Sequence, residues 1–230
     1  MRRGTSLALA VGLAAVAAAG SACSRGARPG GDGQRSTKDA TGGNANAGAG
    51  AEATSFLTNF APLKLVDQRG QPFAVQELRG KVILFNFIFT ACPNVCPVQT
   101  QALAEVQRAI PAADRDRVHF VSVSIDPEHD TPAVLHSFAR RFNVDFSRWT
   151  FVTGGTEDID RLSGRLRLFA ENKDRRPENH GTTLWLMDGK GRLMQRYAGN
   201  PPEVPRLVSE LHTLVQLTSG AANQGGADSL

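Results

Sequence analysis

Residues 81–97 read KVILFNFIFTACPNVCP, and this stretch decides the fold. Its first part, residues 81–89, is an apolar run rich in β-branched and aromatic side chains, which predicts a central strand covered on both faces. A loop with two cysteines follows directly, and a helical pattern begins at about Pro97. The stretch therefore predicts a strand, a cysteine-bearing loop and a helix in immediate succession.

Strands and helices continue to alternate downstream. Apolar runs predict further strands at 118–125, 149–152, 183–187 and 193–197, the last two joined by the turn Asp188–Gly191. Apolar residues at helical spacing predict helices at 98–110, 132–142, from Thr156 onward, and from about 200 to 217. Thr131 before Pro132 is a predicted N-cap. A hairpin with arms at 63–66 and 73–75 precedes these elements.

This order predicts one α/β domain over residues 55–217. A strand, a cysteine loop and a helix near its start, followed by a terminal hairpin and helix, is the thioredoxin-like arrangement. We expect a central mixed sheet with an N-terminal hairpin and a helical insertion. With 41% hydrophobic and 21% charged residues, the composition allows a well-buried core.

Residues 1–23 have the composition of an export signal. Arg2 and Arg3 precede an apolar run, residues 7–19, which is short for a membrane span of about 20 residues. Small residues then lead to Cys23, which is the predicted lipidation site of a bacterial lipoprotein. Gly20 stands where such signals usually carry leucine, so an ordinary signal-peptidase cut and an uncleaved anchor stay open. Each of these three routes exports the chain across a membrane or attaches it to one.

Residues 24–54 are mainly small and polar, which predicts a flexible tether, and residues 218–230 are predicted to form a disordered tail. The formal charge of +4 comes from basic residues scattered through helical stretches. Because they are not gathered with aromatic residues, we expect no nucleic-acid partner.

Cys92 and Cys96 lie at the predicted helix N-terminus. Unpaired backbone N–H groups and the helix dipole stabilise negative charge there, so we expect at least one thiol with a lowered pKa. A thiolate is both the nucleophile of disulfide exchange and the form that binds metal. The spacing allows the sulfurs to share either a disulfide or a metal ion.

A third ligand would separate these two uses. Among the five histidines, His180 has a distinctive place, because it lies in the loop before the strand 183–187, which faces the cysteine loop in thioredoxin-like folds. The cis proline usual in that loop of redox enzymes is missing. Two thiolates favour Cu(I), and an added imidazole also holds Cu(II). The other histidines are expected to serve packing or the surface.

Three motifs together resemble the SCO/SenC family of copper-binding, cytochrome c oxidase assembly proteins. They are TACPNVCP at 90–97, DPEHDTP at 126–132, and His180 before a strand that ends in DGKG at 188–191. The resemblance covers about residues 55–217. It implies that Cys92, Cys96 and His180 are copper ligands.

The resemblance also implies that Asp126 and Asp130 support the site, although Asp130 before a capped helix could simply hold its loop. Gly181 stands where Ser or Thr is common, and Trp185 where tyrosine is frequent. Neither departure removes a ligand.

The function implied by the resemblance is a metallochaperone that carries Cu(I) or Cu(II) to the copper A centre of cytochrome c oxidase. Its partners would be the copper A-bearing subunit and other periplasmic copper carriers or thiol reductants, at the periplasmic face of the inner membrane in a bacterial cell envelope. The alternative is an enzyme, a thiol-disulfide oxidoreductase in which Cys92 attacks a partner disulfide and Cys96 resolves the intermediate. A copper or redox sensor is a third hypothesis.

The wider cysteine spacing, the missing cis proline and His180 favour copper handling over the reductase. An inert disulfide is disfavoured, because it would connect little structure at this loop.

Overall fold

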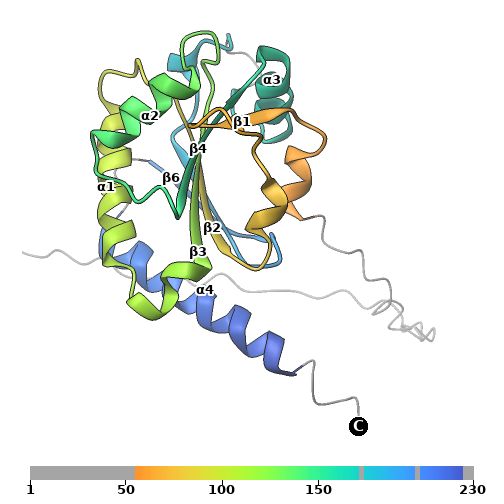
Figure 1. Cartoon of the computed structure of the whole chain (residues 1–230), viewed down its shortest axis with the longest axis vertical. Helices are drawn as coiled ribbons and strands as arrows, with labels where there is room; N and C mark the ends of the chain where they lie inside the picture. The colour runs from red at the N-terminus through yellow and green to blue at the C-terminus, as the bar shows by residue number, and fades with distance from the viewer. Residues whose placement is uncertain (1–54, 171–173, 200–202, 225–230) are drawn as a thin grey trace, which may run out of the picture. The chain divides into compact units, whose positions relative to one another are not determined.

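A computed structural model describes residues 55–170, 174–199 and 203–224, with side chains described to residue 218. The predicted signal, Cys23 and the predicted tether lie outside these residues, as does the end of the predicted tail. The described chain forms a six-stranded sheet of order β1–β4–β3–β2–β5–β6. Helices α1 and α2 lie on one side of this sheet, and α3 lies on the other side (Figure 1).

The strands confirm the predicted α/β class and mixed sheet. They are β1 (Leu65–Asp67), β2 (Val82–Ile88), β3 (Val118–Ser124), β4 (Trp149–Gly154), β5 (Thr183–Met187) and β6 (Leu193–Ala198). β2, β3 and β4 run parallel to one another, whereas β1 pairs antiparallel with β4, and β5 pairs antiparallel with both β2 and β6. Every residue of β2 and β3 is buried, as their apolar sequences predict for central strands.

The helices also follow the predicted pattern, with shifted ends. They are α1 (Val95–Ala109), α2 (Pro132–Arg140), α3 (Thr156–Arg165) and α4 (Val204–Gln224), with short 3₁₀ helices η1 (Phe56–Phe60), η2 (Val75–Leu78), η3 (Ala112–Arg117) and η4 (Pro177–Asn179). The Thr131 hydroxyl caps α2 by accepting the Val134 N–H. α4 continues to Gln224, so the first part of the predicted tail is helical.

Two boundaries differ from those predicted. The N-terminal hairpin is present but short: Val66 bridges Pro72, the Asp67 N–H donates to the Gln71 carbonyl at 2.8 Å, the Phe73 N–H donates to the Leu65 carbonyl at 2.8 Å, and the chain then enters η2 at Val75. Pro72 has no N–H to continue a ladder, and β1 pairs with β4. In addition, α1 begins at Val95, not Pro97, so Cys96 belongs to its first turn, where a proline is tolerated.

Aromatic side chains fill both faces of the sheet. Phe85 contacts Phe56 and Phe60 of η1 on one face, while Trp149 and Phe151 stack on the other. Fully burying a large apolar side chain stabilises a fold by about 2 kcal/mol, so these clusters hold the strands that position the site. No helix among the described residues combines the length and apolarity needed to cross a membrane.

Candidate metal centre

Three loops meet at one end of the central strands. The cysteine loop follows β2, and the loop with Asp126 and Asp130 follows β3, whose Ser124 pairs with Ile88 of β2. Because these strands are parallel, their carboxyl ends lie at the same edge of the sheet. β5 runs antiparallel to β2, so its amino end, directly after His180, reaches this edge as well.

The two cysteines are close together and unbonded to each other. Cys92 lies just before α1 and Cys96 in its first turn, and both are free thiols. The Cys96 backbone N–H donates to the Cys92 sulfur at 3.3 Å. Cys92 is 9% exposed and Cys96 is 2% exposed. Cys92 is therefore the thiol that a partner meets first.

The helix N-terminus does not lower the pKa of the Cys96 thiol. Burial raises that pKa to about 12, and the nearby Cys92 and Asp130 side chains act in the same direction. Cys96 is therefore not the thiol with the lowered pKa that was expected for at least one of the pair, because loss of hydration disfavours the thiolate at this buried position.

Asp130 connects the cysteine loop to the end of β3. Its carboxylate is fully buried and accepts the Thr90 N–H at 3.0 Å, the Thr90 hydroxyl, and the Ser124 hydroxyl at 2.6 Å. A buried carboxylate with several donors is strongly held. Asp130 thus connects the cysteine loop to the end of β3, and its partners Thr90 and Ser124 were not anticipated from the sequence.

Asp126 has a different set of contacts. Its carboxylate meets Nδ1 of the exposed His129 at 2.8 Å, and this hydrogen bond raises the pKa of the His129 imidazole. Its backbone N–H donates to the Ser124 hydroxyl at 3.0 Å. The Asp126 side chain therefore orders its own loop, while Asp130 contacts the cysteine loop.

His180 presents one ring nitrogen that is free to bind. It follows η4, is half-buried, and has its Nδ1 3.0 Å from the Gly181 carbonyl oxygen. A carbonyl can only accept, so Nδ1 carries the proton and Nε2 keeps its lone pair. Burial lowers the pKa of the imidazole and favours this neutral form. A backbone acceptor on one nitrogen is the usual arrangement of a metal-binding histidine.

Phe89 links the histidine to the cysteines. Its carbonyl accepts the Cys92 N–H at 3.2 Å, and its backbone also hydrogen-bonds to the Cys96 thiol. Its ring packs edge-on against the His180 imidazole, with centroids 5.8 Å apart. Sequence reasoning took Phe89 as an ordinary strand residue. The only sequence signal for its contact with the site is its position directly before Thr90 and the cysteines.

The three expected ligands are near one another but do not form a finished site. Within the described ranges, no three His, Cys, Asp or Glu side chains are arranged to hold a metal ion. Two thiols and a neutral imidazole are nevertheless a donor set that suits copper in both oxidation states. The same thiols could instead form a disulfide.

The other histidines lie in different surroundings. His119 of β3 contacts the Thr150 hydroxyl at 2.9 Å, His136 packs on Phe146, and His212 meets Asp114 at 2.6 Å. A shallow groove of about 390 Å³ borders the cysteine loop at Thr90 and continues along α2 past Val134 to Arg141. The groove touches the cysteine loop only at Thr90, and neither cysteine lines it.

Comparison with known proteins assigns the domain. The SCO1/SenC family model matches residues 51–216. A SCO1/SenC family lipoprotein from Bacillus anthracis is 32% identical over 65% of this chain and 90% of its own, with a TM-score of 0.56. BsSco, a member of the Sco family of cytochrome c oxidase assembly proteins with a disulfide switch, is 26% identical over 66% of this chain and 91% of its own, with a TM-score of 0.57. Bradyrhizobium japonicum ScoI with copper bound is 28% identical over 66% and 96%, with a TM-score of 0.56.

Proposed function

Because the chain belongs to the SCO1/SenC family, we propose that it binds copper through Cys92, Cys96 and His180 and delivers it during cytochrome c oxidase assembly. Copper is the cargo of this protein and not a permanent cofactor. The recipient would be the copper A-bearing subunit, since BsSco belongs to a family of oxidase assembly proteins and B. japonicum ScoI holds copper.

The observation that carries this proposal is the meeting of the three donors around Phe89. The residue contacts the backbone of Cys92, the thiol of Cys96 and the ring of His180. The free Nε2 of His180 is a lone-pair donor that a simple disulfide enzyme would not need. Completing a three-ligand site would require the imidazole of His180 and the two thiols to come closer together.

A three-ligand site would also allow copper to be transferred to a recipient. Three ligands leave copper open to an incoming thiolate, so copper can pass to a recipient by ligand exchange. Cys92 is the more exposed thiol, and the groove along α2 reaches the cysteine loop at Thr90. A recipient loop seated there would reach the copper from the Cys92 side.

We assign the chain to the periplasmic face of the inner membrane in a bacterial envelope. Residues 1–23 would supply the export signal, Cys23 the lipid, residues 24–54 the tether and residues 55–217 the working domain. The relative from B. anthracis is a lipoprotein of the same family, which supports an anchored form.

A second candidate function is a thiol-disulfide oxidoreductase. The Cys92 sulfur accepts the Cys96 N–H, so the thiols are close enough to be considered as a redox pair, and BsSco has a disulfide switch. In this reaction Cys92 would attack a partner disulfide and Cys96 would release the reduced partner. The two thiols are oxidised to a disulfide as the partner's disulfide is reduced to two thiols.

An anaerobic copper titration of the reduced full chain distinguishes the two functions. We expect one tightly bound equivalent of Cu(I) and of Cu(II), and His180→Ala should weaken Cu(II) binding by more than about a hundredfold. His136→Ala, on the outer side of α2, is the matched control and should bind like the native protein. A native protein that binds neither ion would overturn the copper proposal and leave the reductase.

A further inference from the structure

The end of the sheet opposite the cysteines is where the N-terminal part of the chain joins the domain. The turn between β5 and β6, residues 188–191, lies at this end, because Met187 pairs with Ile83 at the start of β2. The Phe56 N–H donates to the Gly191 carbonyl at 2.6 Å. A Cβ on Gly191 would lie 2.1 Å from the Ser55 hydroxyl oxygen, so Ser55 is pressed onto this turn.

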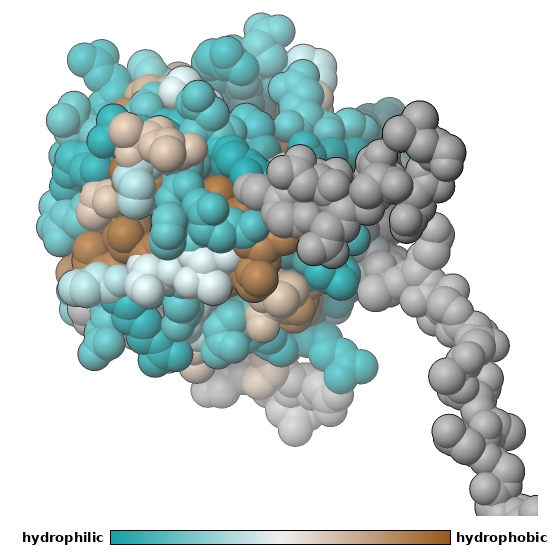
Figure 2. Space-filling model, turned by 90° about the horizontal axis from the view of Figure 1, so that it is seen from below, coloured by the Kyte–Doolittle hydropathy of each residue, from teal (hydrophilic) through white to brown (hydrophobic). Residues whose placement is uncertain are grey.

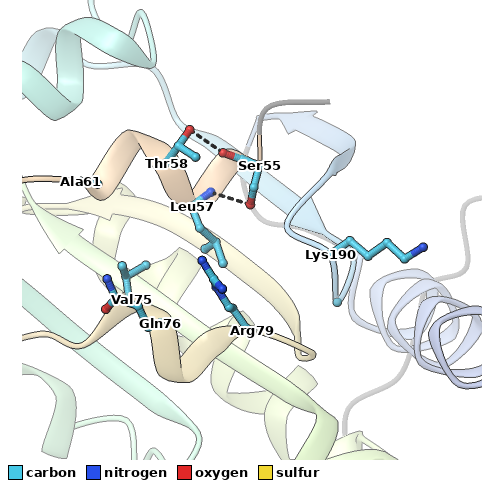
Figure 3. Close-up of a pocket in the computed structure, with 9 residues that line it drawn as sticks. Ser55, Leu57, Thr58, Ala61, Val75, Gln76, Arg79 and Lys190 are labelled. Atoms are coloured by element: carbon cyan, nitrogen blue, oxygen red, sulfur yellow. Dashed lines mark hydrogen bonds between the residues drawn. The ribbon is translucent and has the colours of Figure 1, made fainter. Parts of the chain in front are cut away.

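Two cations flank this junction. Arg79 and Lys190 line a hollow of about 350 Å³ together with Ser55 and Thr58 (Figure 3). Both side chains belong to exposed residues, and neither has an ion pair within the described residues. The Lys190 side chain extends away from the other labelled residues of the hollow (Figure 3). Asp188, the nearest acid on this turn, is already bound to Arg192 at 2.7 Å.

Exposed apolar side chains continue the same surface. A second hollow shares Lys190 with the first and is lined by Arg192, Met194 and Leu217. Leu193, Met194 and Leu217 are 45%, 44% and 64% exposed. Seen from below, the molecule shows hydrophobic surface bordered by hydrophilic surface (Figure 2). Unpaired cations thus lie next to apolar side chains at one end of the domain.

We propose that this basal surface, defined by Arg79, Lys190, Met194 and Leu217, docks on an anionic phospholipid membrane. The inference rests on the membrane attachment in the proposed function. Each basic residue at an anionic bilayer contributes about 1 kcal/mol, and apolar side chains insert at the headgroup boundary. Attachment through the chain that enters at Ser55 makes the contact intramolecular, so modest energies suffice.

Docking would set the direction of copper transfer. The cysteine loop and His180 lie at the opposite end of β2 from Lys190, so they would face away from the bilayer. A recipient domain projecting from the same membrane would then meet the end of the domain that carries the thiols. The tether would limit distance, and the basal surface would fix orientation.

Lysine acetylation of the full chain, read by mass spectrometry, tests this docking. The chain is bound to vesicles of phosphatidylglycerol and phosphatidylcholine, or of phosphatidylcholine alone. Lys190 should react about fivefold more slowly on the anionic vesicles, because it is buried in the headgroups. Lys64, exposed beside the opposite end of β4, is the internal reference and should react equally on both.

Paired variants sharpen the test. Arg79→Gln with Leu217→Ser should remove the protection of Lys190, whereas Arg140→Gln with Val134→Ser, an equal change on α2, should keep it. Equal rates at Lys190 on both vesicles would overturn the proposal. Protection of Lys190 that grows with protein concentration without vesicles would overturn it in favour of a second copy of this chain. Cu(I) titration of the same samples shows separately whether the copper function holds.

Discussion

The two sides of the candidate metal centre are held by different kinds of structure. The cysteine side joins the buried strands, because the Asp130 carboxylate ties Thr90 to Ser124 and Phe89 binds the Cys92 N–H. The histidine side is a short loop held mainly by local hydrogen bonds, such as that from the His180 N–H to the Pro177 carbonyl at 3.3 Å. The Gly181 N–H also donates to the carbonyl of Leu168, a residue farther away in the sequence, at 3.4 Å.

This difference would suit the proposed role, in which the protein both holds and releases copper. Buried hydrogen bonds fix the thiols whether or not a metal is bound, while the imidazole can approach or leave at low cost. Local opening is easiest where few buried contacts hold a segment. The histidine loop is therefore the expected moving part of the site.

The largest test of this contrast removes the buried anchor on the cysteine side. Asp130→Asn replaces one carboxylate oxygen, a hydrogen-bond acceptor, by an NH₂ group that would face the donors of Ser124 or Thr90. At least one buried donor is then left unpaired, so we expect a loss of about 3 kcal/mol in the free energy of unfolding. Denaturant unfolding measures it. Asp126→Asn breaks only a bridge to exposed His129 and should cost less than about 1 kcal/mol. Equal losses in the two variants would contradict the anchoring role.

A histidine fixed within the sheet gives the next largest effect. Burial lowers the pKa of His119 from 6.5 to about 4, so below pH 6.5 the unfolded chain binds a proton that the folded chain excludes. Stability should therefore fall as the pH drops, by about 2 kcal/mol between pH 7 and pH 5.

Urea unfolding at several pH values checks this dependence. His119→Gln should flatten the curve between pH 7 and pH 5 and leave its shape above pH 7 unchanged. A variant curve parallel to the native one throughout would show that other groups control the acid response.

Phe89 contacts both the cysteine side and the histidine side, and changing it should weaken the Cu(II) binding that needs both sides. Phe89→Leu keeps an apolar side chain but loses the edge-on ring contact with His180. We therefore expect a loss of about 1 kcal/mol in the free energy of unfolding and about tenfold in Cu(II) affinity. Phe87→Leu, in the same strand, is the control. It should cost similar stability without changing Cu(II) affinity, and a matching loss of Cu(II) affinity there would remove the special role of Phe89.

The smallest effect should come from the histidine side itself. His180→Ala removes a half-buried ring on a locally held loop, and we expect a change in unfolding free energy within about 0.5 kcal/mol. Measured without metal, this value isolates the loop from its ligand role. A loss as large as that of Asp130→Asn would show that the histidine loop is as firmly built into the fold as the cysteine loop.

The sequence predicted most of the fold because its strands are strongly patterned. The runs at 81–89 and 118–125 became β2 and β3 nearly residue for residue. The predicted hairpin at 63–75 formed with shorter arms, because the strand β1 also takes its pairing from β4, which lies far away in the sequence. Cysteine and histidine positions gave the candidate ligands, since few residue types bind copper.

What the sequence determined by itself is therefore the sheet, the order of its elements and the candidate donors. These follow from apolar periodicity and from side-chain chemistry, which are local properties of the chain. The tertiary structure alone decided that burial raises the pKa of Cys96, that Asp130 binds Thr90 and Ser124 while Asp126 turns to His129, and that Phe89 touches both sides of the site. Each depends on segments far apart in the chain, whose distance and hydration are set only when the strands pack.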